Sequence, residues 1–259
     1  MKNKTIVITG STRGIGRELT VEFLKRGHQV VINGRLKENV EQAVNELKQI
    51  DVGVVGVAGN ITDKATHQKI IREATSAFGK IDIWINNAGI PQPHKLFLDL
   101  NDHDLKKVTE TNIFGLMLGT KTAAGFMTAQ GFGKIFNMAG FGSNGRTMNK
   151  LTLYGTTKCA VSYFTKSFAK EIKGSVLQTG ILNPGMVRTG FLRQSIEIGS
   201  ISPEESKKFK KVYDVLAEDV DVVSGFLANR ILKSNKDYDR IRFLTPSRLV
   251  IKLVKMALR

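Results

Sequence analysis

Short apolar runs that alternate with longer helix-like stretches constrain the fold of this 259-residue chain most strongly. Because the runs are apolar at successive positions, both faces of each strand should be buried, as in a parallel sheet covered by helices on both sides. The runs are Thr5–Thr9, Gln29–Asn33, Gly53–Val57, Ile81–Ile85, Lys134–Met138 and Val176–Leu182, with Ile241–Leu244 as a seventh, edge strand. The helical stretches are 15–27, 37–49, 63–78, 102–129 and 151–173. The pattern predicts an α/β fold of the Rossmann type, a doubly wound parallel sheet of six to seven strands.

Nothing in the sequence divides the chain, so residues 1–259 are expected to form a single domain. Residues 190–235 are predicted to be a polar, helical insertion that lies over the active site. The one cysteine, Cys159, excludes an internal disulfide and favours a reducing, cytoplasmic setting; we expect it to be a small core residue. The four histidines and this cysteine lack the spacing of metal ligands, so no metal site is predicted.

A glycine-rich turn follows the first strand and opens the first helix. Glycines at such a junction let the backbone turn tightly and approach a pyrophosphate, which the helix N-terminus attracts. A simple strand-to-helix turn is the alternative. The position at the first βα junction favours a dinucleotide site. Its residues are Gly10, Ser11, Thr12, Arg13, Gly14, Ile15 and Gly16.

The end of the second strand bears on the choice between NAD and NADP. An acidic residue there would bind the ribose 2′-hydroxyl, but the sequence reads Asn33-Gly34-Arg35. Arg35 and Arg13 would suit a 2′-phosphate, which a guanidinium binds in bidentate fashion. Two solvated arginines on a basic protein are the alternative. We predict NADP(H) as the cofactor.

Tyr154 and Lys158 are four residues apart on a predicted helix and therefore share one face. A phenol with a pKa near 10 is a poor acid–base catalyst at neutral pH, and a neighbouring ammonium group, together with the positive nicotinamide ring, should lower that pKa. The phenol could then give a proton to a carbonyl oxygen while a hydride reaches the carbon. A surface contact is the alternative reading of an isolated pair.

Over about residues 4–192 the sequence resembles the short-chain dehydrogenase/reductase superfamily. The motifs that carry the resemblance are the glycine turn, the Tyr154/Lys158 pair, Asn86-Asn87-Ala88-Gly89, Asn112 and Pro184–Thr189. The resemblance implies catalytic roles for Tyr154, Lys158 and Asn112, with Asn112 placing a water in a proton relay. It also implies cofactor contacts from the glycine turn, Tyr154 and Lys158. Further contacts would come from Asn60, Ile61, Asn87, Ala88, Gly89, Pro184, Gly185, Val187 and Thr189. Relatives usually have an acid where Asn60 stands.

The sequence departs from the family at the catalytic serine. The positions that carry a serine pair in most relatives are Ala139 and Gly140 here. Either the role is lost or Ser143, in a slightly longer loop, takes it, since a carbonyl in a dry pocket needs a donor. The amino-acid sequence resembles the chlorophyll b reductase branch in this loop, in residues 184–189 and in Phe243–Arg248. That resemblance implies an apolar, bulky carbonyl substrate.

The net charge of +16 implies anionic partners. Arg248, Lys252, Lys255 and Arg259 recur at helical spacing, so residues 246–259 are predicted to form a basic amphipathic C-terminal helix. Such a helix could contact an anionic membrane peripherally or dock on the domain or a partner subunit. Its apolar face is too wide for a basic surface that follows the phosphate backbone of a nucleic acid, so no nucleic-acid partner is expected.

The leading hypothesis is NADPH-dependent reduction of a carbonyl, or the reverse oxidation, with Tyr154 as general acid/base. A 3-oxoacyl thioester reductase and a non-catalytic NADP(H)-binding sensor or scaffold are the alternatives. By analogy with the family, the chain is expected to assemble as a homodimer or homotetramer through 102–129 and 151–173.

Overall fold

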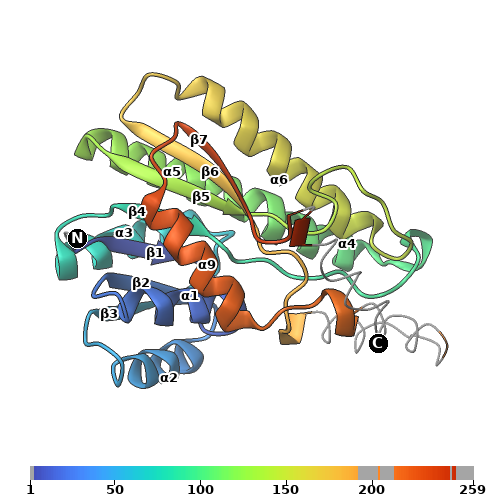
Figure 1. Cartoon of the computed structure of the whole chain (residues 1–259), viewed down its shortest axis with the longest axis horizontal. Helices are drawn as coiled ribbons and strands as arrows, with labels where there is room; N and C mark the ends of the chain where they lie inside the picture. The colour runs from blue at the N-terminus through green and yellow to red at the C-terminus, as the bar shows by residue number, and fades with distance from the viewer. Residues whose placement is uncertain (1–2, 192–203, 205–212, 246, 249–259) are drawn as a thin grey trace.

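The computed structural model describes residues 3–191, 204, 213–245 and 247–248 (Figure 1). It confirms the predicted seven-stranded parallel sheet, in the order β3-β2-β1-β4-β5-β6-β7. The strands are β1 (Thr5–Ile8), β2 (Gln29–Gly34), β3 (Val54–Ala58), β4 (Ile83–Asn86), β5 (Gly133–Met138), β6 (Leu177–Asn183) and β7 (Tyr238–Arg242). The order reverses between β1 and β4, where doubly wound sheets bind their ligands at the carboxyl ends of the strands.

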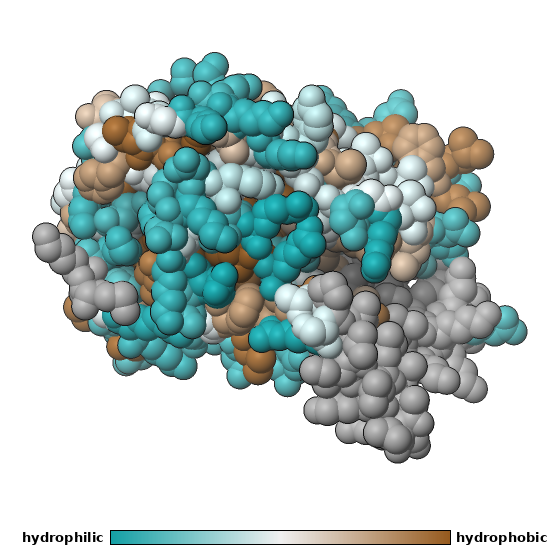
Figure 2. Space-filling view, turned by 45° about the horizontal axis from the view of Figure 1, so that its top comes forward, coloured by the Kyte–Doolittle hydropathy of each residue, from teal (hydrophilic) through white to brown (hydrophobic). Residues whose placement is uncertain are grey.

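Helices cover both faces of the sheet. The named helices are α1 (Gly14–Leu24), α2 (Lys37–Leu47), α3 (Lys64–Phe78), α4 (Asp102–Thr109), α5 (Leu116–Gln130), α6 (Thr152–Glu171) and α9 (Val220–Lys233), with short segments η1 (Phe97–Asp99) and η2 (Glu110–Gly115). One apolar core joins the sheet to α1, α2 and α9, and the second joins it to α3, α5 and α6. Trp84 of β4 is fully buried in the second core, and the face seen in Figure 2 is largely hydrophilic. No helix among the described residues is long and apolar enough to cross a membrane.

The predicted helix over 102–129 is interrupted. Between α4 and α5 the segment η2 is a π-helix, which accommodates an extra residue in the turn. Apolar spacing carries no clear sign of one added residue, so the sequence suggested a continuous helix. Such π turns are frequent at functional sites, and η2 contains Asn112.

The predicted insertion over 190–235 is wrong in its second half. Val220–Lys233 forms α9, whose Val223, Leu227 and Ile231 are fully buried. Helix α9 packs against α1, and Figure 1 shows it crossing beside the sheet. It is therefore a core helix. Residues 192–203 and 205–212 of the predicted insertion lie outside the described residues.

Two further expectations need correction. The seventh strand is Tyr238–Arg242, where every second residue is buried, and only its end overlaps the apolar run 241–244. Cys159 is exposed, because it lies about a quarter turn around α6 from the buried Lys158. Most of the predicted helix over 246–259 lies outside the described residues.

A buried polar ladder ties the centre of the sheet to α5 and α6. Asn86, which ends β4, donates to Asn137 Oδ1 on β5 (2.9 Å) and to Thr120 Oγ1 on α5 (3.0 Å). Asn137 in turn donates to Thr165 Oγ1 on α6 (3.0 Å). An asparagine of the Asn86–Gly89 motif thus ties the neighbouring strands β4 and β5 together.

Candidate active site

The glycine turn after β1 is packed directly against the end of β4. Gly10 has φ +62°, and a Cβ there would lie 2.7 Å from the Ala88 Cα. A Cβ at Gly16 would lie 2.5 Å from the Asn87 Nδ2. That amide nitrogen donates to the carbonyl oxygens of Thr9 (3.0 Å) and Gly10 (2.9 Å). The turn thus needs glycine, and the predicted cofactor residues from the two motifs lie together.

The start of α1 fits a phosphate group. The N-cap side chain of Arg13 makes no capping hydrogen bond, and the first turn of α1 contains no acidic residue. A helix start with these properties suits an anion, because backbone N–H groups and the helix dipole both favour negative charge. A Cβ at Gly14 (φ +59°) would meet Thr189 Cγ2 at 3.9 Å, so Thr189 lies opposite the turn. Predicted cofactor residues that are far apart in the sequence therefore converge.

The two arginines expected to select NADP(H) follow residues that touch each other. Ser11 N donates to Asn33 O (2.8 Å), and a Cβ at Gly34 would lie 2.6 Å from Thr12 Cγ2. Arg13 comes directly after Thr12, and Arg35 directly after Gly34; both are exposed. The chain therefore brings the two guanidinium-bearing residues to the same corner of the sheet.

Asn60 and Ile61 follow β3, the strand that lies beside β2 at the edge of the sheet. Asn60 is exposed, and its Oδ1 accepts a hydrogen bond from Thr62 N (3.2 Å). Ile61 is buried and packs on the π turn, since a Cβ at Gly115 would lie 2.8 Å from Ile61 Cδ1. Ile61 thus links the expected adenine side of the site to the segment that carries Asn112.

Lys158 and Tyr154 lie on the first two turns of α6 and face the site. The Lys158 side chain is 3% exposed, and its Nζ donates to the carbonyl oxygen of Met138 at the end of β5 (3.0 Å). Its Nζ lies 5.7 Å from the centre of the Tyr154 ring. The predicted pair is therefore brought together as expected.

In the cofactor-free protein the pKa of Tyr154 does not show the lowering that is expected with the nicotinamide ring present. Burial raises the pKa of the Tyr154 hydroxyl well above its ordinary value, and burial lowers the pKa of Lys158 to about 8. Desolvation of the phenolate therefore outweighs the attraction of an ammonium group almost 6 Å from the ring. Tyr154 is protonated at neutral pH and is suited to give a proton.

Asn112 is fully buried on η2 and holds the loop after β4. Its Oδ1 accepts from Ile90 N (2.8 Å), and its Nδ2 donates to Ile90 O (2.9 Å) and to Thr157 Oγ1 on α6 (3.2 Å). A Cβ at Gly89 would lie 3.2 Å from Asn112 Oδ1 and 3.5 Å from Lys158 Nζ. Gly89 thus lies between the two predicted catalytic groups and lets them come close.

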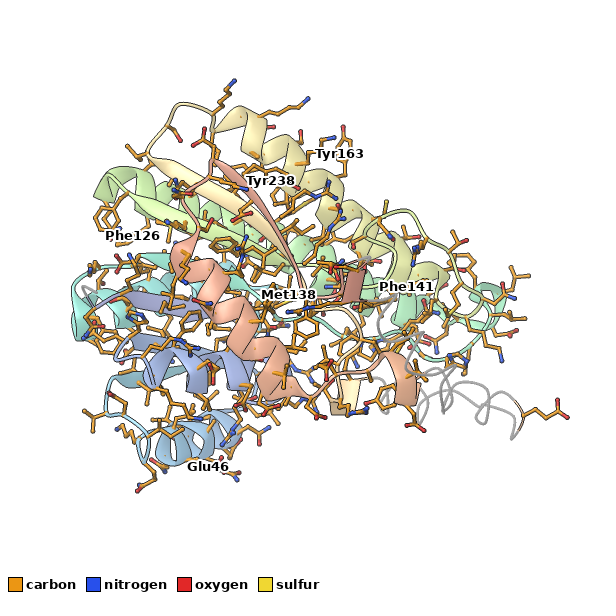
Figure 3. All side chains as sticks on the ribbon, viewed as in Figure 1. Glu46, Phe126, Met138, Phe141, Tyr163 and Tyr238 are labelled. Carbon is orange, nitrogen blue, oxygen red and sulfur yellow. The ribbon has the colours of Figure 1, made fainter. Side chains whose placement is uncertain are left out.

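The loop after β5 explains why the family serine is absent. A Cβ at Gly140 would lie 2.3 Å from the Tyr154 Oη, so the phenol hydroxyl occupies the place of a side chain at position 140. A Cβ at Gly142 would lie 2.5 Å from the Gly155 Cα, so the loop backbone lies directly on α6. Figure 3 shows Met138 near the middle of the molecule and Phe141 in the loop below α6. Ser143, the predicted replacement, closes a turn with Gly140 through its N–H (3.2 Å).

Two contacts of Tyr154 were not expected from the sequence. The fully buried Gln92 accepts from Tyr154 N (2.7 Å) and donates to Lys150 O (2.9 Å), so it caps α6 from a distant loop. The Phe191 ring packs on the Tyr154 ring, with centroids 5.6 Å apart. A glutamine between two prolines and a phenylalanine after Thr189-Gly190 carry no sequence signal for these contacts.

Pro184, Gly185 and Val187 complete the predicted set at the end of β6. Gly185 has φ +75°, and Val187 is buried and pairs with Glu218 in an isolated bridge. The assembled site therefore combines an anion-binding helix start, a buried amine, and a protonated phenol beside an apolar ring. Such a site suits proton transfer to an oxygen next to a bound dinucleotide.

The fold and this site define a class of oxidoreductase. The model of the short chain dehydrogenase family matches residues 4–197, and the chain belongs to that family.

Among curated relatives, the chain is 32% identical over 97% of its length to the probable chlorophyll(ide) b reductase NYC1 of Oryza sativa subsp. japonica, covering 52% of that protein. It is 37% identical over 93% of its length to the chlorophyll(ide) b reductase NOL of Arabidopsis thaliana, covering 70% of that protein. The chain thus spans about half the length of the NYC1 relative.

Among solved structures, the KRED1-Pglu enzyme superposes with a TM-score of 0.78 at 25% identity, over 92% of this chain and 100% of that one. Neighbours of lower identity with the same fold were solved with NADH and with NADPH.

Proposed function

We propose that this protein reduces the carbonyl group of an apolar, bulky substrate with NADPH, and that Tyr154 supplies the proton. The observation that carries the proposal is the geometry of α6, where the Tyr154 hydroxyl lies against Gly140 beside a buried Lys158. The names of the chlorophyll(ide) b reductase relatives favour a formyl-bearing tetrapyrrole or a similar large ring as the substrate.

The bound cofactor would supply a hydride to the carbonyl carbon. Tyr154 would give its proton to the carbonyl oxygen, and its raised pKa means that it carries this proton at neutral pH. Lys158 would hold the cofactor ribose and, through its charge, stabilise the phenolate that remains after the transfer. Asn112 would position a water that returns the proton from solvent.

The preference for NADPH is supported by Arg13 and Arg35, which follow the contacting residues Thr12 and Gly34 at one corner of the sheet. The end of β2 carries no carboxylate that would repel a 2′-phosphate, because Asn33 occupies the place and donates to Val57 O (3.0 Å) and Gly59 O (3.2 Å). Reduction of 3-oxoacyl thioesters and binding without turnover are the alternatives. The missing family serine at position 140 argues mildly against the thioester, and the assembled Tyr154 and Lys158 argue against binding without turnover.

The test is NADPH oxidation, followed by nicotinamide absorbance, against formyl-bearing tetrapyrroles, steroids, quinones and acetoacetyl thioesters. We expect turnover of a bulky aldehyde or ketone, and we expect Tyr154→Phe to abolish it while NADPH binding stays close to wild type. Equal turnover by Tyr154→Phe would contradict the mechanism. Turnover of the acetoacetyl thioester alone would favour the alternative substrate.

Assembly through α5 and α6 is a second part of the proposal. A hollow of about 450 Å³ lies along these helices, and its lining includes Met117, Phe164 and Phe168. Tyr163 beside it is 77% exposed and projects away from the sheet in Figure 3. We propose a second copy of the chain as the occupant. Light scattering should give a dimer or tetramer for the wild type and a smaller species for Tyr163→Glu, and a monomeric wild type would refute this.

Contact of 246–259 with an anionic membrane and a cytoplasmic location stay predictions. Co-sedimentation with anionic vesicles tests the first, and protein that never sediments with them would contradict it. The second rests on the single cysteine alone.

A further inference from the structure

Asn183, the last residue of β6, bridges two segments of the candidate site. Its Nδ2 donates to Ser143 Oγ in the loop after β5 (3.3 Å). Its Oδ1 accepts from the backbone N–H of Gly185, two residues further along (3.1 Å). Asn183 thus contacts the serine that departs from the family pattern.

The backbone fixes which way this amide points. An N–H group can only donate, so the oxygen of the Asn183 amide must face Gly185 and its NH₂ group must face Ser143. Ser143 Oγ therefore accepts the hydrogen bond from Asn183. A serine hydroxyl has one proton to donate, and that proton stays available for another acceptor.

The loop joins Ser143 to Gly140, the residue that lies against the phenol hydroxyl of Tyr154. Ser143 N donates to Gly140 O (3.2 Å), so the two residues close a tight turn. Gly140 is the residue whose missing side chain leaves room for the Tyr154 Oη. Ala139 N also donates to Leu182 O (2.8 Å), which holds the start of the loop at the end of β6.

We propose that Asn183 is a positioning residue that holds the Ser143 hydroxyl as a hydrogen-bond donor to the substrate carbonyl oxygen. This inference rests on the proposed reductase function and deepens it. In most relatives a serine at the position of Gly140 would have this role. Here the donor has moved three residues along the loop, and Asn183 sets its direction.

The decisive variant is Asn183→Asp. The carboxylate keeps the shape of the side chain and still accepts from the Gly185 N–H, but it presents an acceptor to Ser143. The serine hydroxyl would then donate to the carboxylate and lose its free proton. We expect kcat to fall by about 10²-fold, as for Ser143→Ala, since loss of one donor to a developing oxyanion has about this effect. The affinity for NADPH should stay close to wild type.

The double variant Asn183→Asp/Ser143→Ala should be no slower than Ser143→Ala. As the pH is lowered, Asn183→Asp should recover relative to the wild type, because a protonated carboxyl can donate to Ser143 again. A wild-type kcat in Asn183→Asp, combined with a loss in Asn183→Ala, would mean that Asn183 only shapes the Pro184-Gly185 turn and would overturn the proposal. The proposal would also be overturned if the loss of kcat in the double variant equalled the product of the losses in the two single variants.

A measurement without substrate keeps the contact testable if no compound of the panel is reduced. The urea midpoints of the wild type, the two single variants and the double variant form a cycle, and the two substitutions should shift them non-additively. Additive shifts would show that Asn183 and Ser143 do not interact. Failure of the reductase function would appear differently, as turnover that is unaffected by Tyr154→Phe.

Discussion

Restoring a side chain at position 140 should damage the enzyme, although most relatives carry a serine there. A Cβ on Gly140 would lie 2.3 Å from the Tyr154 Oη and 3.2 Å from the Lys158 Cγ. Ordinary contacts begin near 3.4 Å, so the phenol hydroxyl would have to move by about 1 Å. A displacement of that size can slow a reaction by about 10²-fold, which corresponds to about 2.7 kcal/mol in the activation barrier.

The assay compares kcat of Gly140→Ala and Gly140→Ser with the wild type on the best substrate of the panel, together with NADPH affinity from cofactor fluorescence. We expect both variants to lose kcat by a similar factor and to bind NADPH nearly normally. Gly125→Ala is the matched control, because a Cβ there has no neighbour within 4 Å among the described residues and Gly125 lies on an exposed part of α5. A Gly140→Ser variant as active as the wild type would refute the reasoning.

Three other predictions follow from the same contacts. Arg35→Ala should weaken NADPH binding by 10-fold or more, because a charge-assisted hydrogen bond contributes roughly 1.5–3 kcal/mol. The affinity for NADH, measured by titration, should change little. Equal losses of affinity for the two cofactors would contradict a role of Arg35 in binding the 2′-phosphate. Gln92→Leu should lower the unfolding free energy by about 1–3 kcal/mol in urea titrations and reduce kcat, because it leaves the Tyr154 N–H and the Lys150 carbonyl without this partner; unchanged stability would contradict the capping role. Burial lowers the pKa of Lys158 to about 8, so the unfolded chain binds more protons between that pH and about 10.5, and stability should rise with pH across this window. Relative to Lys158→Met, the cofactor-free wild type should gain up to about 2 kcal/mol between pH 7 and 9.5, and a constant difference would show that Lys158 is not buried as an amine.

The sequence predicted the sheet well because buried parallel strands are apolar on both faces and stand out in any chain. The predicted bounds of the edge strand β7 were too far along the chain, because Arg240 and Arg242 alternate with buried residues there and resemble a surface segment. Helix α9 was merged into an insertion, because contact with α1 decides its place and local sequence does not encode that contact.

For the candidate site, the motif residues converge as predicted, because their positions at the ends of parallel strands determine where they meet. The roles of Gln92, Asn183 and Phe191 depend on side-chain contacts between distant loops, which no spacing rule describes. Burial raises the pKa of Tyr154 in the cofactor-free protein, and a separation of four residues carries no information on this burial or on the distance to the ammonium group.

The Asn86–Asn137–Thr165 ladder has a consequence for how the chain finds its fold. Strands that are apolar on both faces could pair in several registers with similar burial, because one valine or isoleucine replaces another at little cost. A slip of β5 by one residue would turn Asn137 to the other face of the sheet, away from both Asn86 and Thr165, and would leave its amide without these partners. Each orphaned group would cost about 1–3 kcal/mol, so misaligned sheets are penalised at the centre of the molecule. The ladder thus acts as an alignment key that makes one pairing of the two central strands the stable one.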